Sequence, residues 1–129
     1  MDALHIKASN NTPEVNLNPN GELEFTGRSV PENSRAFYKP ILEWLKEYSY
    51  IASEQHTKAV FTIEYFNTSS SKCLLDIIRI FDVMHGRGDS VEIIWNCDKN
   101  DTDLYEAGID FESKINCPID IRRVGNLPW

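Results

Sequence analysis

The segment from Lys58 to Phe66 restricts the possible folds of this chain more than any other. Its residues alternate between two sets that would face opposite sides of a β-strand. Ala59, Phe61, Ile63 and Tyr65 would face one side, and Val60, Thr62, Glu64 and Phe66 the other. Both sets contain bulky side chains. We therefore expect a central strand that is covered on both faces of a sheet.

The rest of the chain divides into short extended segments and helical stripes. Three short strands are expected around residues 4–8, 15–17 and 23–25, with a turn at 18–21. Helices are expected at about 33–50, 74–84 and 101–115, and further strands at 91–95 and 119–124. Such alternation predicts parallel pairing with right-handed crossovers. The 129 residues should form a single α/β domain, residues 1–129, whose mixed sheet starts with a meander or hairpin and continues with alternating helices and strands.

Charge and composition narrow the classes of partner. The formal net charge of −7 argues against nucleic acid or an anionic membrane as the main partner, since both attract positive surfaces. No signal peptide and no membrane span is expected. The three cysteines are widely spaced, which favours reduced thiols in a cytoplasmic protein. No nucleotide-binding fingerprint and no metal-binding spacing occurs, so we expect no cofactor and no metal.

The segment from Phe66 to Lys72 carries the clearest functional signal. Four hydroxyl residues, Thr68, Ser69, Ser70 and Ser71, lie between the central strand and the next helix. One hydroxyl would be enough to cap that helix. The others would be solvated, or would make this a phosphorylation switch in which Lys72 pairs with the phosphate. A third possibility is a site for a phosphate or another small ligand at the helix N-terminus.

Three segments resemble the SiaC family of bacterial regulatory phosphoproteins. They are Phe25–Leu45, which includes Arg28-Ser29-Val30-Pro31-Glu32-Asn33, then Glu64–Lys72, and the acidic run from Asp98 to Gly108. The resemblance implies a fold similar to STAS domains and a non-enzymatic partner-switching role. It implies a Ser/Thr kinase that phosphorylates Thr68, a PP2C-type phosphatase that removes the phosphate, and a diguanylate cyclase that the unphosphorylated form activates, in cyclic di-GMP and biofilm signalling.

We expect the partner-binding surface to lie where these motifs meet. Its residues are Arg28, Ser29, Glu32, Asn33, Asn67, Thr68, Ser69, Ser70, Ser71 and Lys72. Arg28 could meet a phosphate or a partner carboxylate. We further expect the Thr68 hydroxyl to cap the following helix, so that phosphorylation puts a dianion into the interface and leaves the fold intact.

Other clusters have simpler interpretations. The acidic residues from Asp98 to Glu112 do not fit a calcium loop, because Tyr105 and Glu106 occupy its fifth and sixth positions. They favour a solvated helix start, or else a face for a basic partner. Cys73 near a helix N-terminus would be the nucleophile if the protein were an enzyme.

Overall fold

The computed structural model describes all residues from Met1 to Trp129. The strands are β1 (Leu4–Ile6), β2 (Glu14–Leu17), β3 (Glu22–Ser29), β4 (Thr57–Phe66), β5 (Val91–Asp98) and β6 (Ile119–Val124). The helices are α1 (Ser34–Ile51), α2 (Thr68–Gly86) and α3 (Thr102–Ser113), and a short 3₁₀ turn, η1 (Ala52–Glu54), follows α1. The predicted elements are therefore all present, and Pro40 lies inside a continuous α1.

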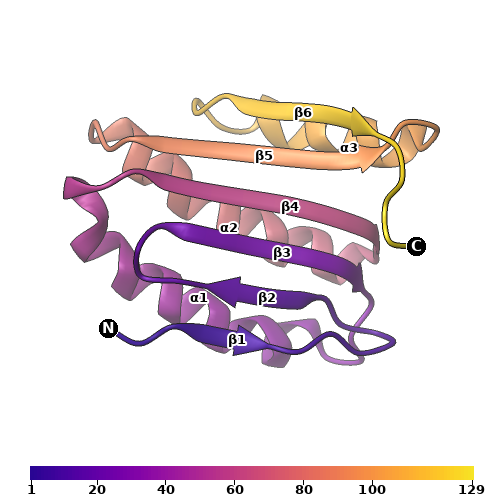
Figure 1. The fold of residues 1–129 in the computed structure, drawn as a ribbon, viewed down its shortest axis with the longest axis horizontal. Coiled ribbons are helices and arrows are strands. Elements are labelled where there is room, and N and C mark those ends of the chain that lie inside the picture. The colour runs from indigo at the N-terminus through magenta and orange to yellow at the C-terminus, as the bar shows by residue number, and fades with distance from the viewer.

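The six strands form one mixed sheet in the order β1-β2-β3-β4-β5-β6. The first three strands pair antiparallel, with a turn in which Gly21 N donates to Asn18 O. The pairs from β3 to β6 are parallel, and each is connected through a helix. This arrangement confirms the predicted fold class. It also puts the carboxyl ends of β3, β4, β5 and β6 at one end of the sheet (Figure 1).

All three helices cover the same face of the sheet (Figure 1). The expectation that the central strand is covered on both faces is therefore wrong. Ala59, Phe61 and Ile63 point into the buried layer, whereas Val60, Thr62 and Glu64 are only half-buried on the open face. Bulk on both faces of β4 did not require a second helical layer, because neighbouring strands shield part of the open face.

The core lies between the sheet and the helices. Phe25 and Phe61 stack at 4.6 Å, and the Trp95 ring packs edge-on against Phe111 at 5.4 Å. The indole Nε1 of Trp95 donates to the carbonyl oxygen of Leu104 at 2.9 Å, so this buried polar group is satisfied. Each fully buried aliphatic or phenyl side chain contributes roughly 2 kcal/mol of transfer free energy. This core fixes the strand ends from which the functional loops start.

A bulge reverses the facing of the last residues of β4. Gly27 pairs with Ile63 but Arg28 pairs with Tyr65, so Glu64 is an extra residue on β4. Tyr65 is consequently 49% exposed, and Phe66 packs against the Trp95 ring instead. The prediction that Tyr65 shares a face with Ile63 is therefore wrong. Bulges of this kind often re-aim side chains beside functional sites.

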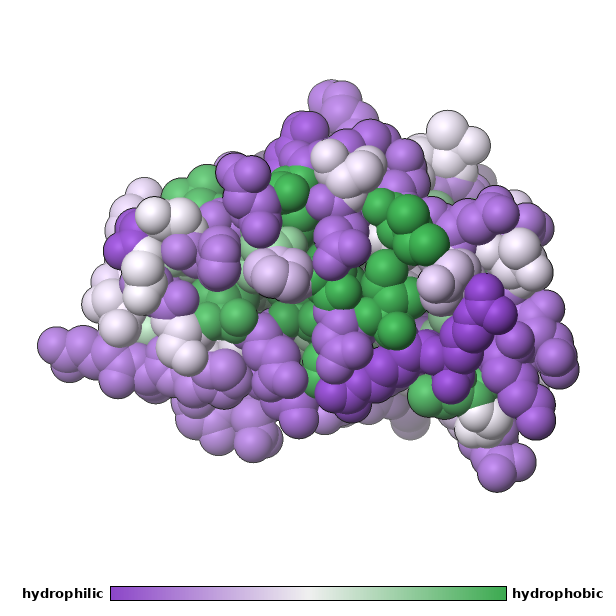
Figure 2. Space-filling view, turned by 90° about the horizontal axis from the view of Figure 1, so that it is seen from above, coloured by the Kyte–Doolittle hydropathy of each residue, from purple (hydrophilic) through white to green (hydrophobic).

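The edge strand β6 and helix α3 form the end of the molecule shown in Figure 2, where apolar side chains gather between polar borders. Ile121 and Ile115 are half-buried there, and Ile109 is exposed. The Glu112 carboxylate accepts a hydrogen bond from Ile119 N, and Asp120 pairs with Arg122. Charges along an edge strand oppose pairing with another chain.

No helix has both the length and the apolar character needed to cross a membrane.

Candidate functional site

Two helices begin side by side at the carboxyl end of the sheet. We call this region the carboxyl edge and define it as residues 28–35 and 64–72. The parallel pairing of β3 with β4 brings these segments together, and Asn67 N donates to Ser29 O at 3.1 Å. The two motifs are far apart in sequence, yet they meet as predicted. The first amides of a helix have no partner within the helix, so two helix starts side by side favour anionic groups here.

Asparagine residues cap both helices. The Asn33 side chain accepts from Ala36 N at 3.1 Å, and Asn67 Oδ1 accepts from Ser70 N at 2.9 Å. The prediction that Thr68 caps α2 is therefore wrong. Asn67 has the extended backbone of an N-cap, with φ −86° and ψ 173°, and Asn is among the preferred caps. Thr68 is the first residue of the helix, is exposed, and makes no side-chain hydrogen bond within the chain.

The hydroxyls of Ser69 and Ser70 are engaged within the protein. Ser70 is fully buried and lies 2.8 Å from the Ser29 hydroxyl, which in turn lies 2.6 Å from the Tyr38 hydroxyl. Ser69 lies 2.7 Å from the hydroxyl of Ser34. Burial raises the pKa of Tyr38 to about 12, so its phenol stays protonated. Two of the predicted binding residues, Ser29 and Ser70, are thus buried and hold the segments of the carboxyl edge together instead of facing a partner.

At the carboxyl edge, three side chains lie on the face of the sheet that no helix covers. They belong to Arg28, Glu64 and Tyr65. Arg28 Nη1 lies 3.9 Å from Glu64 Oε1, and the guanidinium carbon lies 5.7 Å from the centre of the Tyr65 ring. All three groups are exposed or half-buried. Such an ion pair adds little to stability. Arg28 therefore remains available to a partner carboxylate or a phosphate.

A groove of about 730 Å³ runs between the starts of α1 and α2. Four of the predicted partner-binding residues line it, namely Glu32, Asn33, Ser69 and Lys72. Lys72 is one helical turn after Thr68, and both are exposed. A charge on Thr68 would therefore lie one turn from a cation, and Thr68 directly precedes Ser69, which lines the groove.

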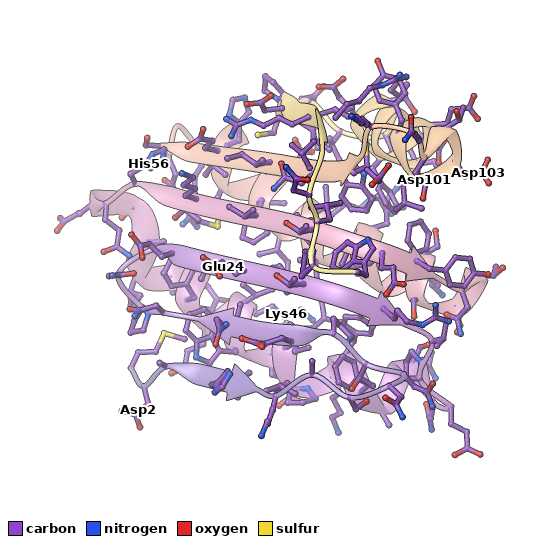
Figure 3. The ribbon with its side chains drawn as sticks, turned by 45° about the vertical axis from the view of Figure 1, so that its right-hand side comes forward. Asp2, Glu24, Lys46, His56, Asp101 and Asp103 are labelled. Atoms are coloured by element: carbon purple, nitrogen blue, oxygen red, sulfur yellow. The ribbon has the colours of Figure 1, made fainter.

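A second hollow of about 510 Å³ lies beside the carboxyl edge. Its lining residues are Glu64, Asp98, Asn100, Asp101, Thr102, Asp103 and Trp129. Asp101 caps α3 through Leu104 N at 3.0 Å, which confirms the interpretation of the acidic run as a helix start. Figure 3 shows Asp101 and Asp103 together at this helix start, and the C-terminal segment 125–129 crossing the end of the sheet. No set of three or more potential metal ligands converges in the structure.

Two potential nucleophiles, Cys73 and Ser90, differ in their surroundings. Burial, with Asp76 adding to it, raises the pKa of the Cys73 thiol, and this disfavours the reactive thiolate. His56 lies between Ser90 and Glu92, with His56 Nδ1 2.6 Å from Ser90 Oγ, in an arrangement that the sequence did not suggest. No hollow of the surface is lined by His56 or Ser90. Figure 3 places His56 at the opposite end of the sheet from Asp101.

Comparisons with known proteins agree with the resemblance. A family model described as SiaC family regulatory phosphoprotein matches residues 6–124. An uncharacterized protein of Pseudomonas aeruginosa strain UCBPP-PA14 is 27% identical over 124 residues, which cover 95% of this chain and 97% of that protein.

Solved structures of SiaC from Pseudomonas aeruginosa have the same fold. The crystal structure of apo-SiaC matches with a TM-score of 0.86 and 26% identity, over 95% of this chain and 99% of that one. A further match, with a TM-score of 0.87 and 25% identity over 94% of this chain and 99% of that one, is in the crystal structure of the diguanylate cyclase SiaD in complex with its activator SiaC.

Proposed function

The chain belongs to the SiaC family of regulatory phosphoproteins, and from this membership we propose that it is a partner-switching regulator controlled by phosphorylation of Thr68. Such a regulator has no catalytic activity of its own. Its unphosphorylated form binds and activates an effector, and a diguanylate cyclase is the effector class that the SiaD–SiaC complex supports. Output would then be cyclic di-GMP and biofilm signalling.

The accessibility of Thr68 is the observation that carries the proposal. Among the four hydroxyl residues at the start of α2, Thr68 is exposed and makes no side-chain hydrogen bond within the chain. In the modification step, Thr68 Oγ1 attacks the γ-phosphorus of a nucleoside triphosphate. The new O–P bond forms as the bond to the nucleoside diphosphate breaks, and the hydroxyl proton passes to a base of the kinase.

The phosphate would be tolerated by the fold but not by the interface. Phosphothreonine at the first position of α2 lies beside the unpaired amides of the first turn and near Lys72. An effector that covers the carboxyl edge would have to bury this dianion, and the single charge of Lys72 would leave part of it uncompensated. A loss of about 3 kcal/mol in binding would reduce the association constant more than a hundredfold.

Three classes of protein partner follow. A Ser/Thr kinase adds the phosphate, a PP2C-type phosphatase removes it, and the effector binds the dephosphorylated carboxyl edge through the residues that line it, including Arg28, Glu32 and Lys72. The three free cysteines fit a reducing, cytoplasmic compartment.

Mass spectrometry of the protein isolated from its native host tests this proposal. Trypsin releases Ala59–Lys72 as one peptide that contains all four candidate hydroxyls. We expect phosphate on Thr68 in a fraction that varies with growth state. Consistent absence of phosphate across conditions would contradict the proposal and would favour a ligand-binding role for the α2 N-terminus instead.

A further inference from the structure

The serine and tyrosine hydroxyls beneath the carboxyl edge form one continuous chain of hydrogen bonds. Its members are Ser29, Ser34, Tyr38, Ser69 and Ser70, and we call it the hydroxyl chain. Consecutive oxygens are separated by 2.6 Å (Tyr38–Ser29), 2.8 Å (Ser29–Ser70), 3.4 Å (Ser70–Ser34) and 2.7 Å (Ser34–Ser69). The last member, Ser69, is 3.2 Å from the N-cap oxygen Asn67 Oδ1. The chain thus joins β3, α1 and α2.

Each hydroxyl has a single proton, and this fixes the direction of donation. Ser29 donates to Ser70, so it must accept from Tyr38. At the other end, Ser69 donates to Asn67 and therefore accepts from Ser34. With the Ser34 proton used in this way, the remaining contact runs from Ser70 to Ser34. Donation runs in one direction, from the Tyr38 phenol to the side-chain oxygen Oδ1 of Asn67.

Burial and bonding withdraw both adjacent serines from modification. The Ser70 side chain is fully buried. Ser69 reaches the surface, but its oxygen accepts from Ser34 and its proton is held by Asn67. The Ser71 hydroxyl makes no hydrogen bond within the chain, but Ser71 is half-buried in the first helical turn, whereas Thr68 is exposed. Thr68 stands outside the chain of bonds.

We infer that the hydroxyl chain selects the acceptor of phosphorylation, with Ser34 as the positioning residue that keeps Ser69 unreactive. This inference rests on the proposed phosphorylation of the carboxyl edge. A kinase needs a hydroxyl whose oxygen is free to attack phosphorus and whose proton can pass to the catalytic base. Ser34 donates to Ser69 and thereby holds the Ser69 side chain in the rotamer that points its proton at Asn67 Oδ1, so neither condition is met. Without the Ser34 hydroxyl the Ser69 side chain can rotate away from Asn67, which frees both its oxygen and its proton. Removing the Ser34 hydroxyl makes Ser69 a competent acceptor.

Three variants expressed in the native host test the selection, with phosphate located on the Ala59–Lys72 peptide by fragmentation. Thr68→Ala should abolish phosphorylation of the peptide, even though three serines remain. Adding Ser34→Ala to Thr68→Ala should produce phosphate on Ser69. The matched control adds Ser29→Ala to Thr68→Ala. It breaks the same chain at a member that does not touch Ser69, and the peptide should stay unmodified.

The outcomes separate the inference from the proposed function. Phosphate on Ser69 in the Thr68→Ala variant would overturn the inference that the hydroxyl chain selects Thr68. Absence of phosphate from Ser69 in the Thr68→Ala, Ser34→Ala double variant would overturn it as well. In both cases, phosphorylation of Thr68 in the wild type would still support the proposed switch. Phosphate on Ser69 in both double variants would mean that loosening of the fold, not the Ser34 hydroxyl, releases Ser69, and would also overturn it. Absence of phosphate from the wild-type peptide would instead refute the proposed function. Restoration of the unmodified state by Ser34→Thr in the Thr68→Ala background would support the role of the hydroxyl.

Discussion

The bond between Tyr38 and Ser29 should show strong energetic coupling. Tyr38→Phe removes the phenol that donates to Ser29 at 2.6 Å and leaves the Ser29 oxygen without its donor. We expect this to cost about 1 to 2 kcal/mol of unfolding free energy, the usual range for a lost buried hydrogen bond. Ser29→Ala leaves both the Tyr38 donor and the Ser70 acceptor unpaired, so it should cost about 2 to 4 kcal/mol. Both sites are fully buried, and water cannot replace the lost partner.

The double variant should be more stable than the sum of the single losses predicts. Once the Tyr38 hydroxyl is gone, Ser29→Ala no longer leaves a buried phenol proton unpaired. The double variant should therefore lose about 1 to 2 kcal/mol less unfolding free energy than the sum of the losses in the two single variants. Urea denaturation of the four proteins measures this coupling directly. Tyr50→Phe, at a strongly exposed site on the same helix, is the control and should change stability by less than about 0.5 kcal/mol. Additivity within about 0.5 kcal/mol would refute the hydrogen bond between Tyr38 and Ser29.

Three further perturbations test other parts of the structure. The pKa of Tyr38 is raised to about 12, so the unfolded chain loses the phenol proton at a lower pH than the folded protein does. The free energy of unfolding should therefore fall between pH 10 and 12, and equilibrium denaturation should show a steeper fall in wild type than in Tyr38→Phe. Asn67→Ala should cost about 1 kcal/mol through loss of the α2 cap, and Asn67→Asp should recover most of it in the same assay. Gly108→Ala should destabilise by about 1 to 3 kcal/mol because its Cβ would lie 2.7 Å from Trp95 Cδ1, whereas Gly86→Ala, with no atom within 4 Å, should be near neutral or mildly stabilising in thermal melts.

Local signals in the sequence predicted most of the elements. The period of two in residues 58–63 and the apolar stripe from Leu74 to Met84 both correspond to elements of the structure. The facing of Tyr65 could not be predicted, because the bulge that reverses it arises from pairing with Gly27 and Arg28 on another strand. The cap of α2 was assigned one residue too late, since Asn67 and Thr68 are both good caps and only the backbone conformation distinguishes them.

The candidate site was predictable in position but not in its internal bonding. The motifs around Arg28 and Thr68 were expected at the same edge, and parallel pairing of β3 with β4 brings them there. The hydroxyl chain had no local signal, because Ser34 and Ser69 are 35 residues apart and Ser29 and Ser70 are 41 apart. Contacts at such separation depend on the fold as a whole, so Ser34 and Tyr38 were not predicted as part of the site.

The affinity of the effector for the two forms of this protein decides whether phosphorylation of Thr68 acts as a switch. Calorimetry would compare unphosphorylated protein with protein carrying stoichiometric phosphate on Thr68, using the diguanylate cyclase of the same host as ligand. We expect the affinity of the phosphorylated form to be weaker by at least about a hundredfold, equivalent to about 3 kcal/mol, and its thermal melting temperature to be nearly unchanged. Equal affinity for both forms would contradict the proposal that Thr68 phosphorylation switches the partner.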